Sequence, residues 1–196
     1  KDRAAVFLGG KHPDMVLYYN YHDRFISSDY YAEDVPPWLD SFNQDLNLET
    51  YRDSLWTKSL PDSLYLKYAR EDYFYGETDS YRNEPYSPVF PIGFDPDIEP
   101  GDEIMGMPWF EKFTLNLCES VLNEESLGQD DHVDLLSISL SAMDWIIHRY
   151  GPFSQEVMDA SIKLDKYLGD FISDLDRSIG LEHIEFVLTA DHGGLP

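Results

Sequence analysis

The strongest periodic pattern lies at residues 154–179, where apolar positions recur at the spacing of an α-helix. Ser154, followed by Gln155 and Glu156, supplies the polar groups that begin a helix, and Gly180 is typical of a helix end. The pattern therefore predicts one long amphipathic helix. Its apolar positions are Val157, Ile162, Leu164, Leu168, Phe171, Ile172 and Leu175.

Two short apolar runs flank this helix and predict strands. Residues 135–140 precede the helix, residues 185–190 follow it, and each run leads into polar residues. A strand, a long helix and a second strand form the crossover unit of a parallel sheet. The pattern therefore predicts the α/β class, with the strand at 185–190 buried.

The N-terminal part of the chain gives shorter signals. Residues 1–10 run from charged to apolar and stop at two glycines, which indicates either a buried strand or the start of a helix followed by a turn. Residues 16–19 and 24–28 resemble two short strands, and the polar residues between them favour a hairpin.

Two further helices are expected around a looser middle stretch. One begins after two prolines, near Trp38, and the other covers Met107 to about Asn123. Residues 48–100 hold half of the 12 prolines and many tyrosines, and so many aromatic side chains favour an ordered cap over disorder. These tyrosines are Tyr65, Tyr68, Tyr73, Tyr75, Tyr81 and Tyr86.

Composition narrows the classes of function. The 196 residues include 38 acidic and 14 basic ones, a formal net charge of −24, and 42% are apolar, enough to form a core. The shortage of Lys and Arg argues against nucleic acid and against an anionic membrane surface as partners, because clustered cations hold phosphate groups. No apolar run approaches the ~20 residues that cross a bilayer. The single cysteine, Cys118, allows neither an internal disulfide nor a Cys-rich zinc cluster, and its helical context predicts a buried thiol.

Two clusters of carboxylate and imidazole follow the predicted strands. Asp144 and His148 are four residues apart after the first strand, and Asp191 and His192 follow the second. Ligands of α/β proteins gather at the carboxyl ends of the strands, so both clusters are expected at one edge of the sheet. Carboxylate oxygen and imidazole nitrogen suit Zn²⁺ or a similar divalent ion, and two such pairs suggest two metals side by side.

A structural role competes with this hypothesis. An aspartate after a strand often caps the next helix, and an Asp-His dipeptide is common by chance. Either cluster alone therefore favours a structural role, and the occurrence of both after consecutive strands leaves the two interpretations balanced. Four other histidines lie in polar or loop contexts and are expected at the surface: His12, His22, His132 and His183.

The chain also resembles the alkaline phosphatase superfamily, in particular the branch of type I phosphodiesterases, nucleotide pyrophosphatases and single-chain bacterial zinc alkaline phosphatases. The segment from Lys1 to Gly10 is similar to the part that supplies a lysine and an arginine to the substrate phosphate in monoesterase members. The combination of D-x-x-x-H-x-x-G-P with a later A-D-H-G is specific. The resemblance is carried by Ser141-Ala142-Met143-Asp144, His148, Gly151-Pro152, Ser154, Glu156, Asp159, Asp165 and Leu188-Thr189-Ala190-Asp191-His192-Gly193, with Phe25-Ile26-Ser27-Ser28 and Pro37-Trp38-Leu39 also similar.

The resemblance implies an α/β/α sandwich with a mainly parallel sheet and two zinc ions that are bridged by the transferred phosphoryl group. Asp144 and His148 would ligate one zinc, and Asp191 and His192 the other. Lys1 and Arg3 would bind the phosphate oxygens of a small phosphate ester, which favours a doubly charged monoester over a diester. It also implies a periplasmic or secreted protein.

The chain departs from the family pattern at both ends. The family's nucleophilic Thr or Ser, with an aspartate ligand before it, lies upstream of the Lys-x-Arg segment, and a further histidine ligand lies downstream of A-D-H-G. We therefore expect residues 1–196 to be one fragment of a larger catalytic domain, without phosphatase turnover alone. Within it, residues 11–106 are expected to form a cap-like insertion and residues 107–196 the core that carries the metal ligands.

Three functions follow as alternatives. The first is zinc-dependent hydrolysis of phosphate monoesters. The second is a phosphodiesterase or nucleotide pyrophosphatase on the same fold, and the pair Lys1 and Arg3 argues against it, because diesterases usually lack this pair. The third is a non-catalytic binding module in which the tyrosine-rich stretch recognises a sugar or a protein.

Overall fold

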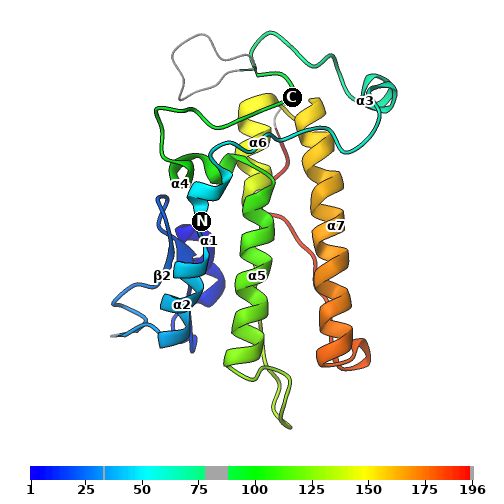
Figure 1. The fold of residues 1–196 in the computed structure, drawn as a ribbon. Helices are drawn as coiled ribbons and strands as arrows, with labels where there is room; N and C mark the ends of the chain where they lie inside the picture. Colours follow the sequence, from blue (N-terminus) through cyan, green and yellow to red (C-terminus); the bar gives the residue numbers. More distant parts are fainter. Residues whose placement is uncertain (33, 78–87, 195–196) are drawn as a thin grey trace.

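The computed structural model describes residues 1–32, 34–77 and 88–194. These residues form seven α-helices, three 3-10 helices and one two-stranded sheet (Figure 1). The elements are α1 (Asp2–Gly9), β1 (Tyr18–Tyr19), β2 (Phe25–Ile26), α2 (Pro37–Asp45), η1 (Leu48–Tyr51), α3 (Asp62–Tyr68), α4 (Pro100–Glu103), η2 (Ile104–Gly106), α5 (Trp109–Glu124), α6 (Ala142–Tyr150), α7 (Gln155–Ser178) and η3 (Leu181–His183).

The long helix α7 forms where the periodic pattern predicts it. The Ser154 hydroxyl accepts a hydrogen bond from the Val157 N–H at 3.1 Å, so Ser154 is the N-cap. Gly180 follows the helix with a φ of 91°, a conformation that glycine adopts without steric cost. α7 packs against both α5 and α6, and these three helices form the body of the molecule in Figure 1.

The shorter elements of the N-terminal part are also confirmed. β1 and β2 pair antiparallel, with Tyr19 opposite Phe25, as the hairpin prediction requires. α2 begins at Pro37, whose fixed φ suits the first turn of a helix. Residues 1–10 form a helix, the second of the two predicted alternatives, and no residue of α1 is buried.

The two strands predicted at residues 135–140 and 185–190 do not form in this structure, and that prediction is wrong. Both segments are irregular, and Val187 and Leu188 of the second are 84% and 96% exposed instead of buried. A strand forms when a neighbour takes up its backbone hydrogen bonds, and among the described residues no strand pairs with either segment. Leu136, Ile138 and Leu140 instead pack on the side chains of α5 and α7.

Two hydrophobic clusters hold the helices together. The larger is rich in aromatic side chains and joins the hairpin, α2 and η2 to α5 and α6. Within it, Phe110 of α5 contacts the rings of both Tyr19 and Phe25. The smaller cluster lies between α5 and α7 and includes Cys118, whose burial raises its pKa to about 12, as expected of an unreactive thiol.

The middle stretch is tied to α7 by a buried carboxylate. Asp159 accepts hydrogen bonds from Trp56 Nε1 at 2.6 Å, from the Ser59 N–H at 2.6 Å and from the Tyr65 hydroxyl at 2.5 Å. Tyr65 is therefore buried, whereas three other tyrosines of this stretch, Tyr68, Tyr73 and Tyr75, are exposed. Tyr81 and Tyr86 lie outside the described residues.

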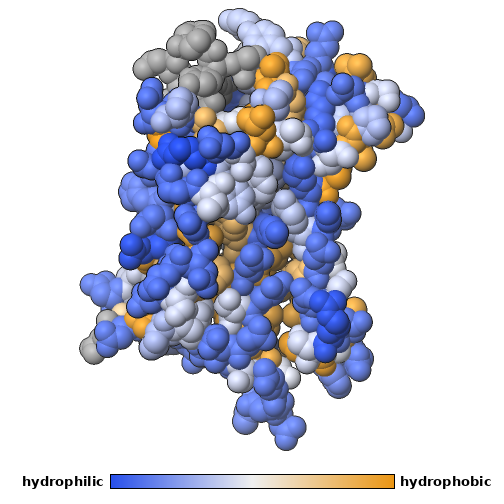
Figure 2. Space-filling model, viewed as in Figure 1, coloured by the Kyte–Doolittle hydropathy of each residue, from blue (hydrophilic) through white to orange (hydrophobic). Residues whose placement is uncertain are grey.

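The surface in Figure 2 is mainly polar, in line with the many charged residues of the sequence. Figure 2 shows a face covered mainly by hydrophilic side chains, with small separate hydrophobic areas between them. Within the described part of the chain, no helix combines the length and the apolar character needed to span a membrane.

Candidate active site

Helix α6 places Asp144 at the centre of the candidate site. Asp144 lies in the first turn of α6, and His148 lies one turn later on the same face, because side chains four residues apart on a helix are neighbours. The ammonium of Lys1, at the start of α1, donates a hydrogen bond to Asp144 Oδ2. The same ammonium lies 5.6 Å from the centre of the Trp145 ring.

Both histidines of the two clusters face the same carboxylate oxygen. His148 Nε2 lies 3.4 Å from Asp144 Oδ1, and His192 Nε2 lies 3.7 Å from that atom. Asp191 lies beside His192, with its Oδ2 3.5 Å from His192 Nε2. The structure thus brings the two clusters together, as expected from the sequence. Helix α6 and an irregular segment carry them, and not the edge of a sheet as predicted.

These separations can be compared with those in a zinc site. Two ligands that each lie about 2.0–2.1 Å from a tetrahedral zinc are about 3.3 Å apart. The pairs Asp144–His148 and Asp191–His192 have donor atoms 3.4 and 3.5 Å apart, close to that value. Among the described residues, no group of three or more His, Cys, Asp or Glu side chains is placed to hold one metal ion together. The donor chemistry of each pair fits zinc, and the described residues do not form a closed cage.

The surroundings of Asp144 favour its charged form. Partial burial alone would raise its pKa, but the hydrogen bond from Lys1 and the charges of Lys1, His148 and His192 outweigh burial and lower the pKa below the usual value. Asp144 is therefore ionised near neutral pH. Its negative charge can pair with the Lys1 ammonium or bind a metal ion.

Arg3 of α1, the other cation proposed to bind phosphate, makes no side-chain hydrogen bond or ion pair with this group in the described part of the chain. Arg3 is exposed, and no ion pair joins it to another described residue. Its guanidinium is therefore free to take a ligand from solvent. The four histidines expected at the surface, His12, His22, His132 and His183, are all exposed.

One buried acidic residue next to the site was missed from the sequence. Glu111 of α5 is only 3% exposed, and its Oε1 accepts hydrogen bonds from the N–H groups of Ala142 and Met143 at 2.7 and 3.3 Å. A signal was present, because Glu111, Leu115 and Cys118 follow the i, i+4, i+7 spacing of a buried stripe. An acidic residue at an apolar position of this kind indicates a specific buried partner.

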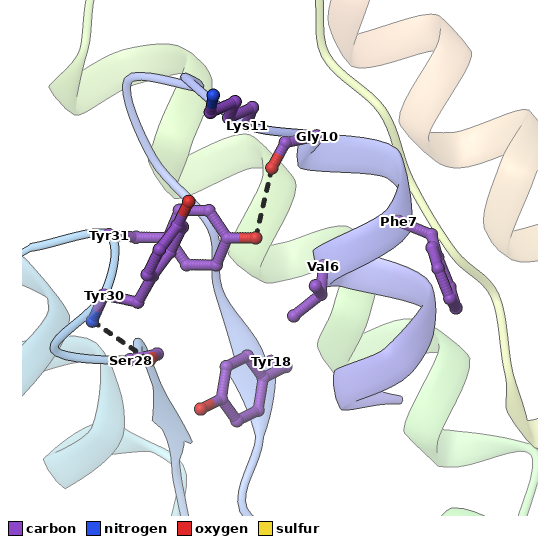
Figure 3. A pocket seen from close by; sticks show the side chains of 8 residues that line it. All are labelled: Val6, Phe7, Gly10, Lys11, Tyr18, Ser28, Tyr30 and Tyr31. Atoms are coloured by element: carbon purple, nitrogen blue, oxygen red, sulfur yellow. Dashed lines mark hydrogen bonds between the residues drawn. The ribbon is translucent and has the colours of Figure 1, made fainter.

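A second place that could hold a ligand lies beside the C-terminal half of α1. It is an open hollow of about 560 Å³ lined by Val6, Phe7, Gly10, Lys11, Tyr18, Ser28, Tyr30 and Tyr31. In Figure 3 the hydroxyl of Tyr31, one of the lining residues, donates to the Gly10 carbonyl, at 3.2 Å. Its lining includes one charged side chain, Lys11, and no carboxylate or imidazole. The hollow therefore lacks the groups for phosphoryl chemistry that surround Asp144.

The family model for type I phosphodiesterases and nucleotide pyrophosphatases matches residues 6–196. The chain belongs to this family. The alkaline phosphatase PhoV of Synechococcus elongatus is 33% identical over 195 residues, and the alkaline phosphatase PafA of Elizabethkingia meningoseptica is 28% identical over 194 residues. In both comparisons the match covers 98% of this chain and 35% of the relative.

A solved structure supports the same family at the level of the fold. The crystal structure of wild-type PafA matches with a TM-score of 0.81 and 28% identity, over 92% of this chain and 35% of that chain. The predicted α/β class is confirmed by this match to the alkaline phosphatase fold. The chain itself spans about a third of the length of these phosphodiesterase-family relatives, and within its described residues it supplies helices and one small sheet.

Proposed function

We propose that the whole protein hydrolyses phosphate monoesters at a site built around Asp144, with two zinc ions as cofactors. The observation that carries the proposal is the convergence of the Lys1 ammonium and the imidazoles of His148 and His192 on one carboxylate. Membership of a family of phosphoric ester hydrolases and the names of the two relatives, both called alkaline phosphatases, support the same reaction class.

The residues of this chain would divide the zinc ligands between two pairs. Asp144 and His148 would hold one ion, and Asp191 and His192 the other, which agrees with the donor separation within each pair. The Asp144–His192 distance of 3.7 Å places the two pairs side by side. Bound zinc would supply Lewis-acid stabilisation of the negative charge that develops on the attacking and leaving oxygens.

Lys1 and Arg3 would bind the phosphate group. The Lys1 ammonium already donates to a carboxylate oxygen and can donate in the same way to a phosphate oxygen, and the centre of the Trp145 ring lies 5.6 Å from it. Arg3 offers a planar fork that suits two phosphate oxygens at once. Because a monoester carries up to two negative charges and a diester only one, two cations favour the monoester.

We also propose that residues 11–106 act as a cap on the core formed by residues 107–196. The guanidinium of Arg70 donates to the Tyr150 carbonyl at the end of α6, and the ring of Trp56 lies 6.4 Å from that of Tyr150. These contacts link the middle stretch to the helix that carries Asp144. A periplasmic or secreted location is proposed from the resemblance to bacterial alkaline phosphatases, and cell fractionation would test it.

The test of the proposed function uses the whole protein and the variant Lys1→Ala. We expect kcat/KM for an aryl phosphate monoester to fall by about 10²-fold, in line with the loss of one charged donor to a transition state, while the rate with a diester changes much less. Lys11→Ala is the matched control, because Lys11 is an exposed lysine near the same helix and outside the site.

Metal analysis separates the alternatives. Two equivalents of zinc and loss of activity on chelation would support a metal-dependent esterase. Faster turnover of diesters than of monoesters by the wild-type protein, or an equal effect of Lys1→Ala on both substrates, would favour the phosphodiesterase alternative. A protein that binds no zinc and turns over neither substrate would be the non-catalytic binding module.

A further inference from the structure

The first turn of α6 is not capped by its own residues. The N-cap residue of α6, Ser141, makes no side-chain hydrogen bond to the turn that follows. Its hydroxyl lies 3.1 Å from the hydroxyl of Ser139, outside the helix. The first N–H groups of a helix have no partner within the helix, so this turn needs an acceptor from elsewhere.

Glu111 supplies that acceptor from a different helix. Its Oε1 accepts hydrogen bonds from the N–H groups of Ala142 and Met143, which lie 31 and 32 residues further along the chain. The carboxylate therefore replaces a local cap and joins α5 to the start of α6.

The second oxygen of Glu111 indicates that stability alone does not account for this residue. Glu111 Oε2 is buried and has no hydrogen-bond partner among the described residues. A buried carboxylate with one unpaired oxygen costs free energy. Residues that violate such a rule concentrate at functional sites.

We propose that Glu111 is a positioning residue that holds Asp144 and His148 in place for metal binding. The N–H of Met143 donates a hydrogen bond to Glu111, and Asp144 directly follows Met143. The backbone position of Asp144 therefore depends on this turn. His148 lies one turn further along the same rigid helix and moves with it. The role in metal binding rests on the proposed function, whereas the role in fixing the turn stands on the hydrogen bonds alone.

The experiment compares Glu111→Leu and Glu111→Gln in the whole protein. Leucine removes the acceptor at similar size, and glutamine keeps an acceptor oxygen and loses the charge. Amide hydrogen exchange of the Ala142 and Met143 N–H groups reports on the turn without any metal, and competition with a chelator reports zinc affinity. We expect Glu111→Leu to speed exchange at both amides at least about tenfold and to weaken zinc binding about tenfold or more, with Glu111→Gln retaining most of both.

Asp159→Asn is the matched control. Asp159 is an equally buried carboxylate that accepts a backbone N–H, but its donors are Trp56, Ser59 and Tyr65 and none of them lies on α6. The Asp159→Asn substitution should lower global stability without selectively speeding amide hydrogen exchange at Ala142 and Met143.

Three results would overturn the positioning role: unchanged exchange in Glu111→Leu, unchanged zinc affinity with faster exchange, or the same local effect in Asp159→Asn. If the wild-type protein binds no zinc, the proposed function fails. In that case the exchange at Ala142 and Met143 still decides whether Glu111 holds the turn.

Discussion

Glu156 makes the stability of the protein depend on pH in an unusual direction. It lies in the first turn of α7 with no exposed surface, and neither carboxylate oxygen has a hydrogen-bond partner among the described residues. Burial, reinforced by the charges of Glu77 and Asp72, raises its pKa from 4.5 to about 8. Glu156 is therefore protonated in the native protein at neutral pH.

The sign and size of the effect follow from proton linkage. The native chain holds one proton more than the unfolded chain between pH 4.5 and about 8, so the free energy of unfolding falls as pH rises through this interval. At about 1.36 kcal/mol for each pH unit, the interval corresponds to about 5 kcal/mol as an upper limit. Side-chain rearrangement and water entry recover part of it, so we expect about 3 kcal/mol.

The perturbation that tests this reasoning is Glu156→Gln, which keeps the size of the side chain and removes the ionisable group. Urea unfolding of the whole protein, followed by tryptophan fluorescence, should give equal stability for variant and wild type near pH 4.5. At about pH 9 the variant should be more stable by about 3 kcal/mol.

Glu124→Gln is the control, because it makes the same chemical substitution at an exposed position of α5. The difference in free energy of unfolding between Glu124→Gln and wild type should not grow between about pH 6 and 9. A constant difference between Glu156→Gln and wild type across this range would refute the assignment of a raised pKa to Glu156.

Three further predictions concern the cap of α7, the buried network and the site. Ser154→Ala should lower the free energy of unfolding by about 1 kcal/mol through loss of the N-cap, and an unchanged urea midpoint would contradict this. Asp159→Ala leaves the buried donors of Trp56 and Tyr65 without an acceptor and should cost about 3–5 kcal/mol in the same assay. Asp144→Asn in the whole protein should reduce bound zinc, measured by elemental analysis, and slow monoester hydrolysis at least about 10²-fold, and full zinc content with normal turnover would exclude Asp144 as a ligand.

Short-range patterns in the sequence were sufficient for the helices α2, α5 and α7, whereas α3, α4 and α6 were not predicted. Ser154, the apolar periodicity and Gly180 predict α7 because capping and helical spacing act over a few residues. Asp144 and His148 were noted as four residues apart, and helix α6 turns that spacing into a shared face. The hairpin β1–β2 likewise needs only neighbouring segments, and the motif residues of the C-terminal part were enough to indicate the family.

Long-range contacts decided the rest. The 3.7 Å approach of His192 to Asp144, and the bond from Lys1 to the same carboxylate, join residues distant in the chain. Glu111 differs from an ordinary surface glutamate only because α5 packs where the first turn of α6 begins. The runs at 135–140 and 185–190 have the composition of strands, but a strand depends on a neighbour that accepts and donates its hydrogen bonds, and composition carries no information about that neighbour.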